Sequence, residues 1–158
     1  MSDSISPRMR HRFWLWLAMM LIGTAASAGN GPPADCDNLS AIEPFTQFRY
    51  DQFQAIFNTT CTGCHPGNSG AGNMGLGNGF SYNALVEVPS DGLPSMLRVA
   101  PGDPLQSMLF LKINCDDPPG LGIRMPLNGN NLSTTQQAFF YDWIRAGAPL
   151  SRLGFEDR

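Results

Sequence analysis

The stretch Cys61-Thr62-Gly63-Cys64-His65 decides how this chain of 158 residues folds. It is a Cys-x-x-Cys-His pattern, which is typical of covalent c-type haem attachment. Two thiols three residues apart on a short helical turn can reach the two vinyl groups of one haem and form thioethers. The histidine that follows then faces the iron as an axial ligand. The pattern predicts one covalent haem c, anchored at Cys61 and Cys64, with its iron bound by His65.

Two other kinds of site share a Cys-x-x-Cys pair. A structural zinc site normally needs a second pair of ligands at similar spacing, whereas Cys36 and Cys115 stand alone in the sequence. A thioredoxin-like redox pair needs a βαβ context, and the chain shows no strand pattern of useful length. Covalent haem is therefore the favoured interpretation.

The chain begins with the features of an export signal. Basic residues precede an apolar run over residues 13–26, and Ala26-Ser27-Ala28 forms an A-x-A cleavage site. The run is shorter than the roughly 20 residues that a membrane span needs, so an uncleaved anchor is the weaker alternative. We expect residues 1–28 to be a signal peptide, the mature protein to be periplasmic, and no membrane span to remain after cleavage.

The charge balance points to a class of partner. Removing the three arginines and Asp3 of the signal from chain totals of 10 Lys+Arg and 13 Asp+Glu leaves 7 basic and 12 acidic residues. A formal charge of about −5 disfavours nucleic acid and anionic membranes, and it favours a redox partner with a basic docking surface.

Two cysteines, Cys36 and Cys115, lie outside the Cys-x-x-Cys-His pattern. In an oxidising compartment two such thiols form a disulfide, which here would tie the mature N-terminus to the body of the domain. The alternative is that both are free and buried as small apolar side chains.

The rest of the chain predicts helices joined by long loops. Residues 29–45 form an irregular N-terminal segment because Gly and Pro interrupt it. The spacing of aromatic residues predicts a helix over 46–60 that leads into Cys61. A glycine-rich loop follows over 66–80, and then a short helix over 81–86 with Ser81 as its cap.

Two further helices complete the predicted domain. Asp103-Pro104 is a helix start signal, and the helix should run to Asn114 with Met108 on its apolar face. The last helix opens on a capping box of Ser133 and Gln136 and ends before Gly147. We expect an all-α domain over 46–150, followed by a C-terminal tail over 151–158.

The candidates for the second iron ligand are narrowed by elimination. His65 is the only histidine after the signal, which excludes a second histidine from the same chain. A methionine, Lys112, the terminal amine and an open position remain. Of the four methionines after residue 28, Met96 and Met108 are predicted to pack in the core, and nothing supports Met74.

Met125 differs in its context. It lies in a loop between a Pro-Pro-Gly breaker and the last helix, and Pro126 restricts its backbone to extended conformations. A loop methionine held away from any helix face has little reason to serve as core. We favour Met125 as the second ligand of the iron.

On these residues the chain resembles the class I cytochromes c. The likeness covers about residues 46–149 and rests on an aromatic helix before Cys-x-x-Cys-His, on Met125-Pro126 and on a terminal helix ending Trp-Ile-Arg-Ala-Gly-Ala. Residues 97–104 together with 124–126 are similar to small exported bacterial single-haem domains. The resemblance implies a helical fold whose first and last helices cross near one edge of the haem, with His65 and Met125 as iron ligands and two thioether anchors.

One departure concerns the partner of His65. Many class I members carry a Gly-Pro-x-Leu segment whose proline carbonyl accepts a hydrogen bond from the ligand histidine, and such partners tune a metal. Here Gly75-Leu76 lies in a similar place without the proline. The sequence therefore leaves the hydrogen-bond partner of His65 open.

Three functions are compatible with such a haem. If both axial positions are filled, the iron has no vacant site and the protein performs one-electron transfer rather than catalysis. If Met125 is absent from the iron or easily displaced, a haem enzyme or gas-binding protein is the alternative. A non-redox module with a structural haem is the weakest of the three.

Overall fold

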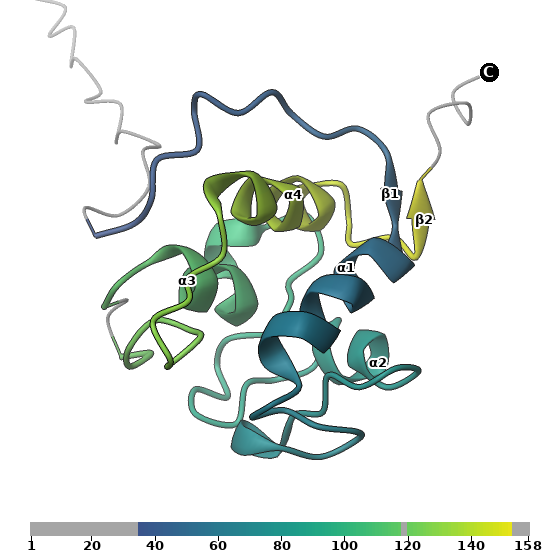
Figure 1. Ribbon diagram of the computed structural model, residues 1–158, viewed down its shortest axis with the longest axis vertical. Coiled ribbons are helices and arrows are strands. Elements are labelled where there is room, and N and C mark those ends of the chain that lie inside the picture. Colours follow the sequence, from purple (N-terminus) through teal and green to yellow (C-terminus); the bar gives the residue numbers. More distant parts are fainter. Residues whose placement is uncertain (1–34, 118–119, 153–158) are drawn as a thin grey trace, which may run out of the picture. The chain divides into compact units, whose positions relative to one another are not determined.

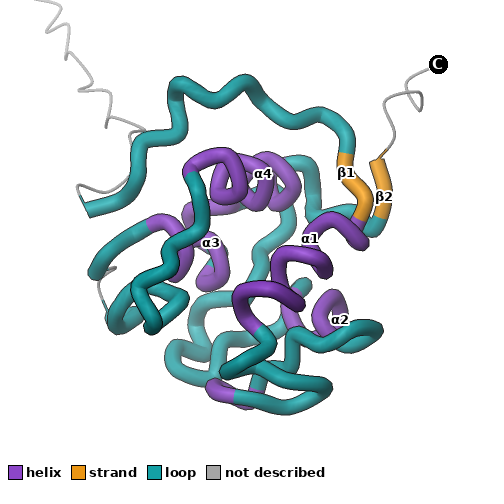
Figure 2. The backbone as a smooth tube through the Cα atoms, in the orientation of Figure 1, coloured by secondary structure: helices purple, strands orange, loops and turns teal. Residues whose placement is uncertain are grey.

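A computed structural model of the protein describes residues 35–117 and 120–152. The predicted signal peptide lies outside these ranges, as do residues 153–158 of the predicted tail. The described residues form four α-helices and one pair of short strands, joined by long loops (Figures 1 and 2). The elements are β1 (Phe48–Arg49), α1 (Tyr50–Ile56), α2 (Ser81–Leu85), α3 (Met108–Asn114), α4 (Thr134–Arg145) and β2 (Ser151–Arg152).

Aromatic side chains join α1 to α4, the first and last helices. Phe53 is fully buried and stacks on Phe139 with ring centroids 4.2 Å apart and an interplanar angle of 8°. Its centroid also lies 4.7 Å from that of Trp143, another fully buried side chain. Stacked and tilted aromatic pairs are favourable beyond the area that they bury. The aromatic face predicted for the first helix is therefore the face that packs in the core.

The all-α prediction is wrong where the two ends of the domain meet. Residues 48–49 pair antiparallel with residues 151–152, and the amide of Tyr50 donates to the carbonyl of Leu150 at 3.0 Å. The first helix therefore begins at Tyr50 instead of residue 46. Strands of two residues are too short to give an alternating sequence pattern. Their pairing also depends on a partner segment that is far away in the sequence.

The helix predicted from Asp103 to Asn114 is interrupted. A 3₁₀ turn, Pro104–Gln106, is capped by Asp103, whose carboxylate accepts from the Gln106 amide. Ser107 is then extended, with φ −107° and ψ 115°, and α3 begins after it. The buried Ser107 hydroxyl accepts from the Ala100 amide at 2.8 Å and donates to the Asp103 carbonyl. These side-chain bonds compete with a continuous helix.

The caps of the two other predicted helices differ in outcome. Ser133 and Gln136 form the predicted capping box at the start of α4, and Gly147 follows its end with φ 93°. Ser81 was predicted to cap α2, but the residue at the N-cap position is Phe80. The Ser81 hydroxyl is instead buried, where it donates to Gln54 and accepts from Tyr50.

Cys36 and Cys115 form a disulfide, as predicted, with the two sulfurs 2.01 Å apart. The same residues make an isolated antiparallel bridge, which fastens the described N-terminal residues to the end of α3. None of the helices in residues 35–117 and 120–152 has the length and apolar character that crossing a membrane requires.

The core analysis predicts an unequal effect of two phenylalanine truncations. Phe53→Ala should lower the free energy of unfolding by about 3–5 kcal/mol, because it empties a fully buried site between α1 and α4. Phe80→Ala is the matched control, since Phe80 is 48% exposed, and should change it by only about 0.5 kcal/mol. Chemical denaturation measures both, and equal losses would contradict the assignment of the core.

Candidate functional site

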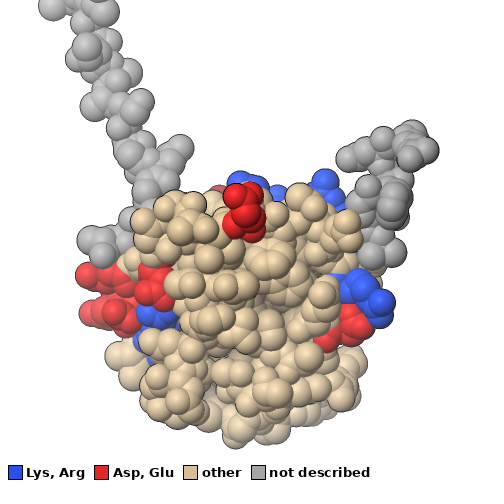
Figure 3. All heavy atoms as spheres, turned by 45° about the horizontal axis from the view of Figure 1, so that its top comes forward, with Lys and Arg blue, Asp and Glu red and all other residues tan. Residues whose placement is uncertain are grey.

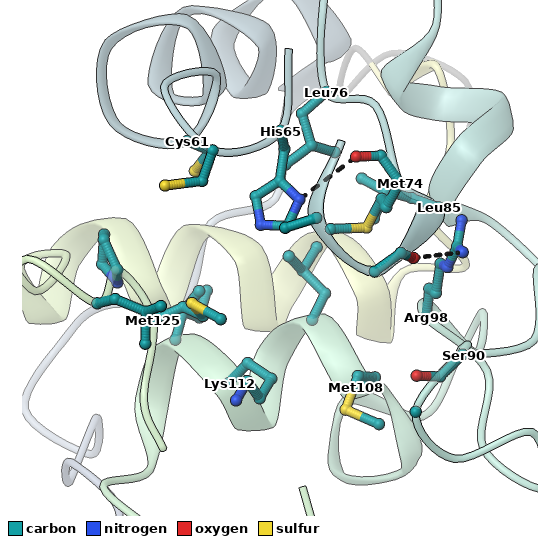
Figure 4. Close-up of a pocket in the computed structure, with 18 of the residues that line it drawn as sticks. Cys61, His65, Met74, Leu76, Leu85, Ser90, Arg98, Met108, Lys112 and Met125 are labelled. Atoms are coloured by element: carbon teal, nitrogen blue, oxygen red, sulfur yellow. Dashed lines mark hydrogen bonds between the residues drawn. The ribbon is translucent and has the colours of Figure 1, made fainter. Parts of the chain in front are cut away.

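One cavity of about 330 Å³ brings together the side chains singled out in the sequence. The Cys-x-x-Cys-His turn lies on one side of it, and α3 with the loop that carries Met125 lies on the other (Figure 4). Most of its lining is apolar. The leucine and isoleucine side chains in the lining are Leu76, Leu85, Leu109, Ile113, Leu121, Leu127 and Leu132.

The chain reaches the Cys-x-x-Cys-His pattern through a π-helical turn, Phe57–Cys61, that continues α1. The turn of the motif closes on itself, because the amides of Cys64 and His65 both donate to the carbonyl of Cys61, at 3.1 and 3.0 Å. The predicted short helical turn is therefore present. All three reactive side chains of the motif line the cavity, and Figure 4 shows Cys61 and His65 on the same side of it.

Cys61 and Cys64 are free thiols, the first partly buried and the second exposed. Burial, with a smaller contribution from Cys64, raises the pKa of the Cys61 thiol to about 11. Thioredoxin-like redox pairs depend on the opposite shift, because their attacking thiol must ionise near neutral pH.

Residues 35–117 and 120–152 contain no group of three or more His, Cys, Asp and Glu side chains that could hold a metal ion.

His65 has a backbone partner in place of the missing proline. Its Nδ1 lies 3.3 Å from the carbonyl oxygen of Met74, the residue directly before Gly75-Leu76. A carbonyl can only accept, so this contact assigns the ring proton to Nδ1. In the neutral imidazole this leaves the lone pair of Nε2 available to a metal. Figure 4 shows the ring projecting into the cavity beside Cys61.

The glycine-rich loop packs its backbone against the motif. A Cβ at position 70 would lie 2.6 Å from the Cα of His65 and 2.9 Å from the carbonyl oxygen of Met74. A Cβ at position 75 would lie 2.4 Å from backbone atoms of residues 67 and 68. The loop was predicted, but its close approach to His65 was not, because glycine spacing alone does not show what the backbone touches.

The opposite wall is formed by α3 and the loop that follows it. The Met125 amide donates to the Lys112 carbonyl at 2.7 Å, which brings the loop to the end of the helix. The Lys112 ammonium donates to the carbonyls of Leu121 and Ile123. Burial lowers the pKa of Lys112. Lys112 and Met125 both line the cavity, across from His65 in Figure 4.

Three of the four methionines after residue 28 line the cavity. Met96 packs against the core, as predicted. Met108 was predicted to do the same, but it lies in the cavity wall instead, near Ser90 and Arg98 and away from Cys61 (Figure 4). Met108 is the first residue of α3, which begins after Ser107. Met74 lies on the His65 side, where its carbonyl is engaged.

Arg98 is a cavity residue that the sequence did not indicate. It is 9% exposed, and its guanidinium donates to the carbonyls of Ala84, Gly72 and Asn73 at 2.8, 3.1 and 3.3 Å. In the part of the chain that the structure describes, no carboxylate lies within ion-pair distance of it. A lone arginine in a loop gives no sequence signal that it is buried in the wall of a cavity.

Comparisons of the chain with protein-family models, with curated proteins and with solved structures found no match. The site must therefore be interpreted from its own residues.

The close packing at position 70 can be tested with a single methyl group. Gly70→Ala should lower the free energy of unfolding by about 1–3 kcal/mol, because the backbone of the motif and of Met74 must move apart. Gly63→Ala is the control, since a Cβ there meets nothing within 4 Å although Gly63 belongs to the motif itself. Thermal or chemical unfolding of both variants provides the comparison, and similar losses would refute the packing described here.

Proposed function

We propose that this protein is a single-haem c-type cytochrome that performs one-electron transfer in the periplasm. Haem is bound covalently through Cys61 and Cys64, and its iron is ligated by His65 and Met125. The observation that carries the proposal is the meeting of a Cys-x-x-Cys-His turn and a loop methionine on two sides of one largely apolar cavity. The two segments are sixty residues apart in the sequence.

The residues present fit the requirements of a haem. Two thiols for thioethers, an imidazole and a thioether sulfur all line the same space. Aliphatic side chains supply the contacts that a porphyrin face needs. Arg98 supplies a buried cation without a carboxylate partner among the described residues, which suits the propionates of haem. Bound haem iron supplies a one-electron couple, whose potential methionine ligation raises.

The chain's own groups prepare the two axial positions. The Met74 carbonyl holds the His65 proton on Nδ1 and so fixes both the tautomer and the direction of the ring. The leucines and Ile113 make the lining of the cavity largely apolar. A low dielectric around a metal site is one of the means by which a protein sets its potential.

Met125 suits the second axial position better than the other candidates do. Met74 lies on the same side as His65, and Met108 lies toward the Arg98 end of the cavity (Figure 4). Lys112 would have to give up its hydrogen bonds to two carbonyls and lose a proton before it could ligate iron. Met125 has a neutral sulfur that needs neither step.

Two filled axial positions favour an electron carrier over a haem enzyme or gas-binding protein. The net negative charge of the chain supports a redox partner with a basic docking surface. On the face drawn in Figure 3, acidic and basic side chains lie beside one another near the edge, and the broad area between these clusters is uncharged. The disulfide is compatible with the oxidising compartment that the signal peptide predicts.

Covalent attachment gives the first test of this proposal. Cys61→Ser or Cys64→Ser should reduce the haem that stays with the polypeptide after denaturing electrophoresis, because each removes one thioether. The Cys36→Ser/Cys115→Ser double variant is the control, since those sulfurs pair with each other, and it should keep its haem stain. Unchanged staining in the Cys61 and Cys64 variants would show that the motif does not attach haem.

Ligation by Met125 gives the second test. Met125→Ala should yield a high-spin or ligand-exchanged haem with a lower reduction potential, because the thioether that raises the potential is lost. Absorption spectra of the oxidised protein and redox titration measure both effects. Met108→Ala is the matched control and should leave the spectrum low-spin. A parent protein that is already high-spin would favour the enzyme or gas-binding alternative instead.

A further inference from the structure

Arg124, the residue directly before Met125, is held at three points. Its side chain is only 9% exposed. Its Nε donates to the carbonyl of Ile113 at 3.1 Å, Nη1 donates to the carboxylate of Asp116 at 3.0 Å, and Nη2 donates to the carboxylate of Asp37. The guanidinium therefore links the Met125 loop to the end of α3 and to the N-terminal segment.

Asp37 is itself fixed in place. Its amide donates to the Asn114 carbonyl at 3.0 Å, and its carboxylate also accepts from the buried Gln137 side chain of α4 at 2.8 Å. The hydrogen bond from Arg124 is the main cause that lowers the pKa of Asp37. The preceding residue, Cys36, is bonded to Cys115. Arg124 thus meets a carboxylate on a residue that is held by the end of α3 and by α4.

Apolar burial does little to hold this loop. Ile123 and Leu127, which flank Met125, are 65% and 58% exposed. Its main chain is fastened by polar contacts instead, because the amides of Arg124 and Met125 donate to the carbonyls of Asp116 and Lys112 at 3.2 and 2.7 Å. The place of Met125 therefore depends on polar contacts to the end of α3 and to the segment over residues 35–37.

We propose that Arg124 is a positioning residue for Met125, and that the disulfide-anchored segment over residues 35–37 forms the second half of the same clamp. The inference rests on the proposed function, because it takes Met125 as an iron ligand. The clamp keeps the Met125 sulfur on the iron and sets how readily an external ligand replaces it.

The expected effect on ligand binding follows if the Met125 loop has two states, closed with Met125 on the iron and open with Met125 away from it. An external ligand such as imidazole binds the iron only when Met125 has left it, so its apparent affinity scales with the fraction of open loop. Removing the guanidinium leaves Asp37 without its charged partner and opens the loop more often.

Imidazole titration of the oxidised holoprotein tests the role of Arg124. Arg124→Gln should bind imidazole about tenfold more tightly or better and should show a weaker methionine-to-iron charge-transfer band. The imidazole affinity of Arg124→Lys should lie between those of Arg124→Gln and the parent, because one ammonium cannot donate to three acceptors in fixed directions. Arg49→Gln is the control, since its ion pair with Asp51 has side chains 64% and 62% exposed, and it should match the parent.

The second half of the clamp is tested separately. Cys36→Ser/Cys115→Ser should raise imidazole affinity in the same direction while the haem stays attached through Cys61 and Cys64. An unchanged affinity in this double variant would overturn the part assigned to the disulfide-anchored segment. Asp37→Asn should also raise the affinity, and it replaces Arg124→Gln as the decisive variant if the latter does not fold.

The outcomes separate this inference from the proposed function. If Arg124→Gln loses stability toward denaturant but keeps the parent's imidazole affinity and charge-transfer band, Arg124 only holds the fold and the positioning role is wrong. If the parent itself lacks the band, or binds imidazole as tightly as Met125→Ala does, then ligation by Met125 fails and the proposed function fails with it.

Discussion

The packing of α1 against α4 through Phe53 is the contact on which the rest of the structure depends. Phe53 lies between Phe139 and Trp143 of α4, and α1 runs on through its π-helical turn into Cys61. The direction of α1 therefore sets where the two thiols and His65 emerge. Because α4 also packs against α3, one helix fixes both walls of the cavity relative to each other.

On the His65 side of the cavity, the carbonyl of one residue does what the family resemblance expects of the carbonyl of another. The resemblance to class I cytochromes c implies a proline carbonyl near residue 75, but this chain has none there. The carbonyl of Met74 occupies that role, and the absence of a Cβ at positions 70 and 75 is what lets the loop come close enough. What matters physically is an acceptor at the right place, and any residue can supply a carbonyl.

The sequence was informative where a feature is local and poor where it depends on distant partners. The Ser133 cap, the helical turn at Cys61 and the pairing of Cys36 with Cys115 were all predictable, because spacing and residue chemistry define them. The pairing of β1 with β2 and the break at Ser107 were not, because each depends on backbone groups far along the chain or on one buried hydroxyl. Arg98 was missed for the same reason, since only the fold shows that it faces the cavity.

The two proposed iron ligands, His65 and Met125, differ in how they are held, and this difference has a physical consequence. His65 belongs to a turn that continues a helix with a fully buried phenylalanine, so moving it would disturb the core. Met125 belongs to a loop whose neighbours are exposed and whose anchors are hydrogen bonds and ion pairs. Such contacts contribute less each than burial of a large apolar side chain. If a haem is bound as proposed, opening of the site should therefore begin at Met125, while His65 and the two cysteines of the motif stay in place.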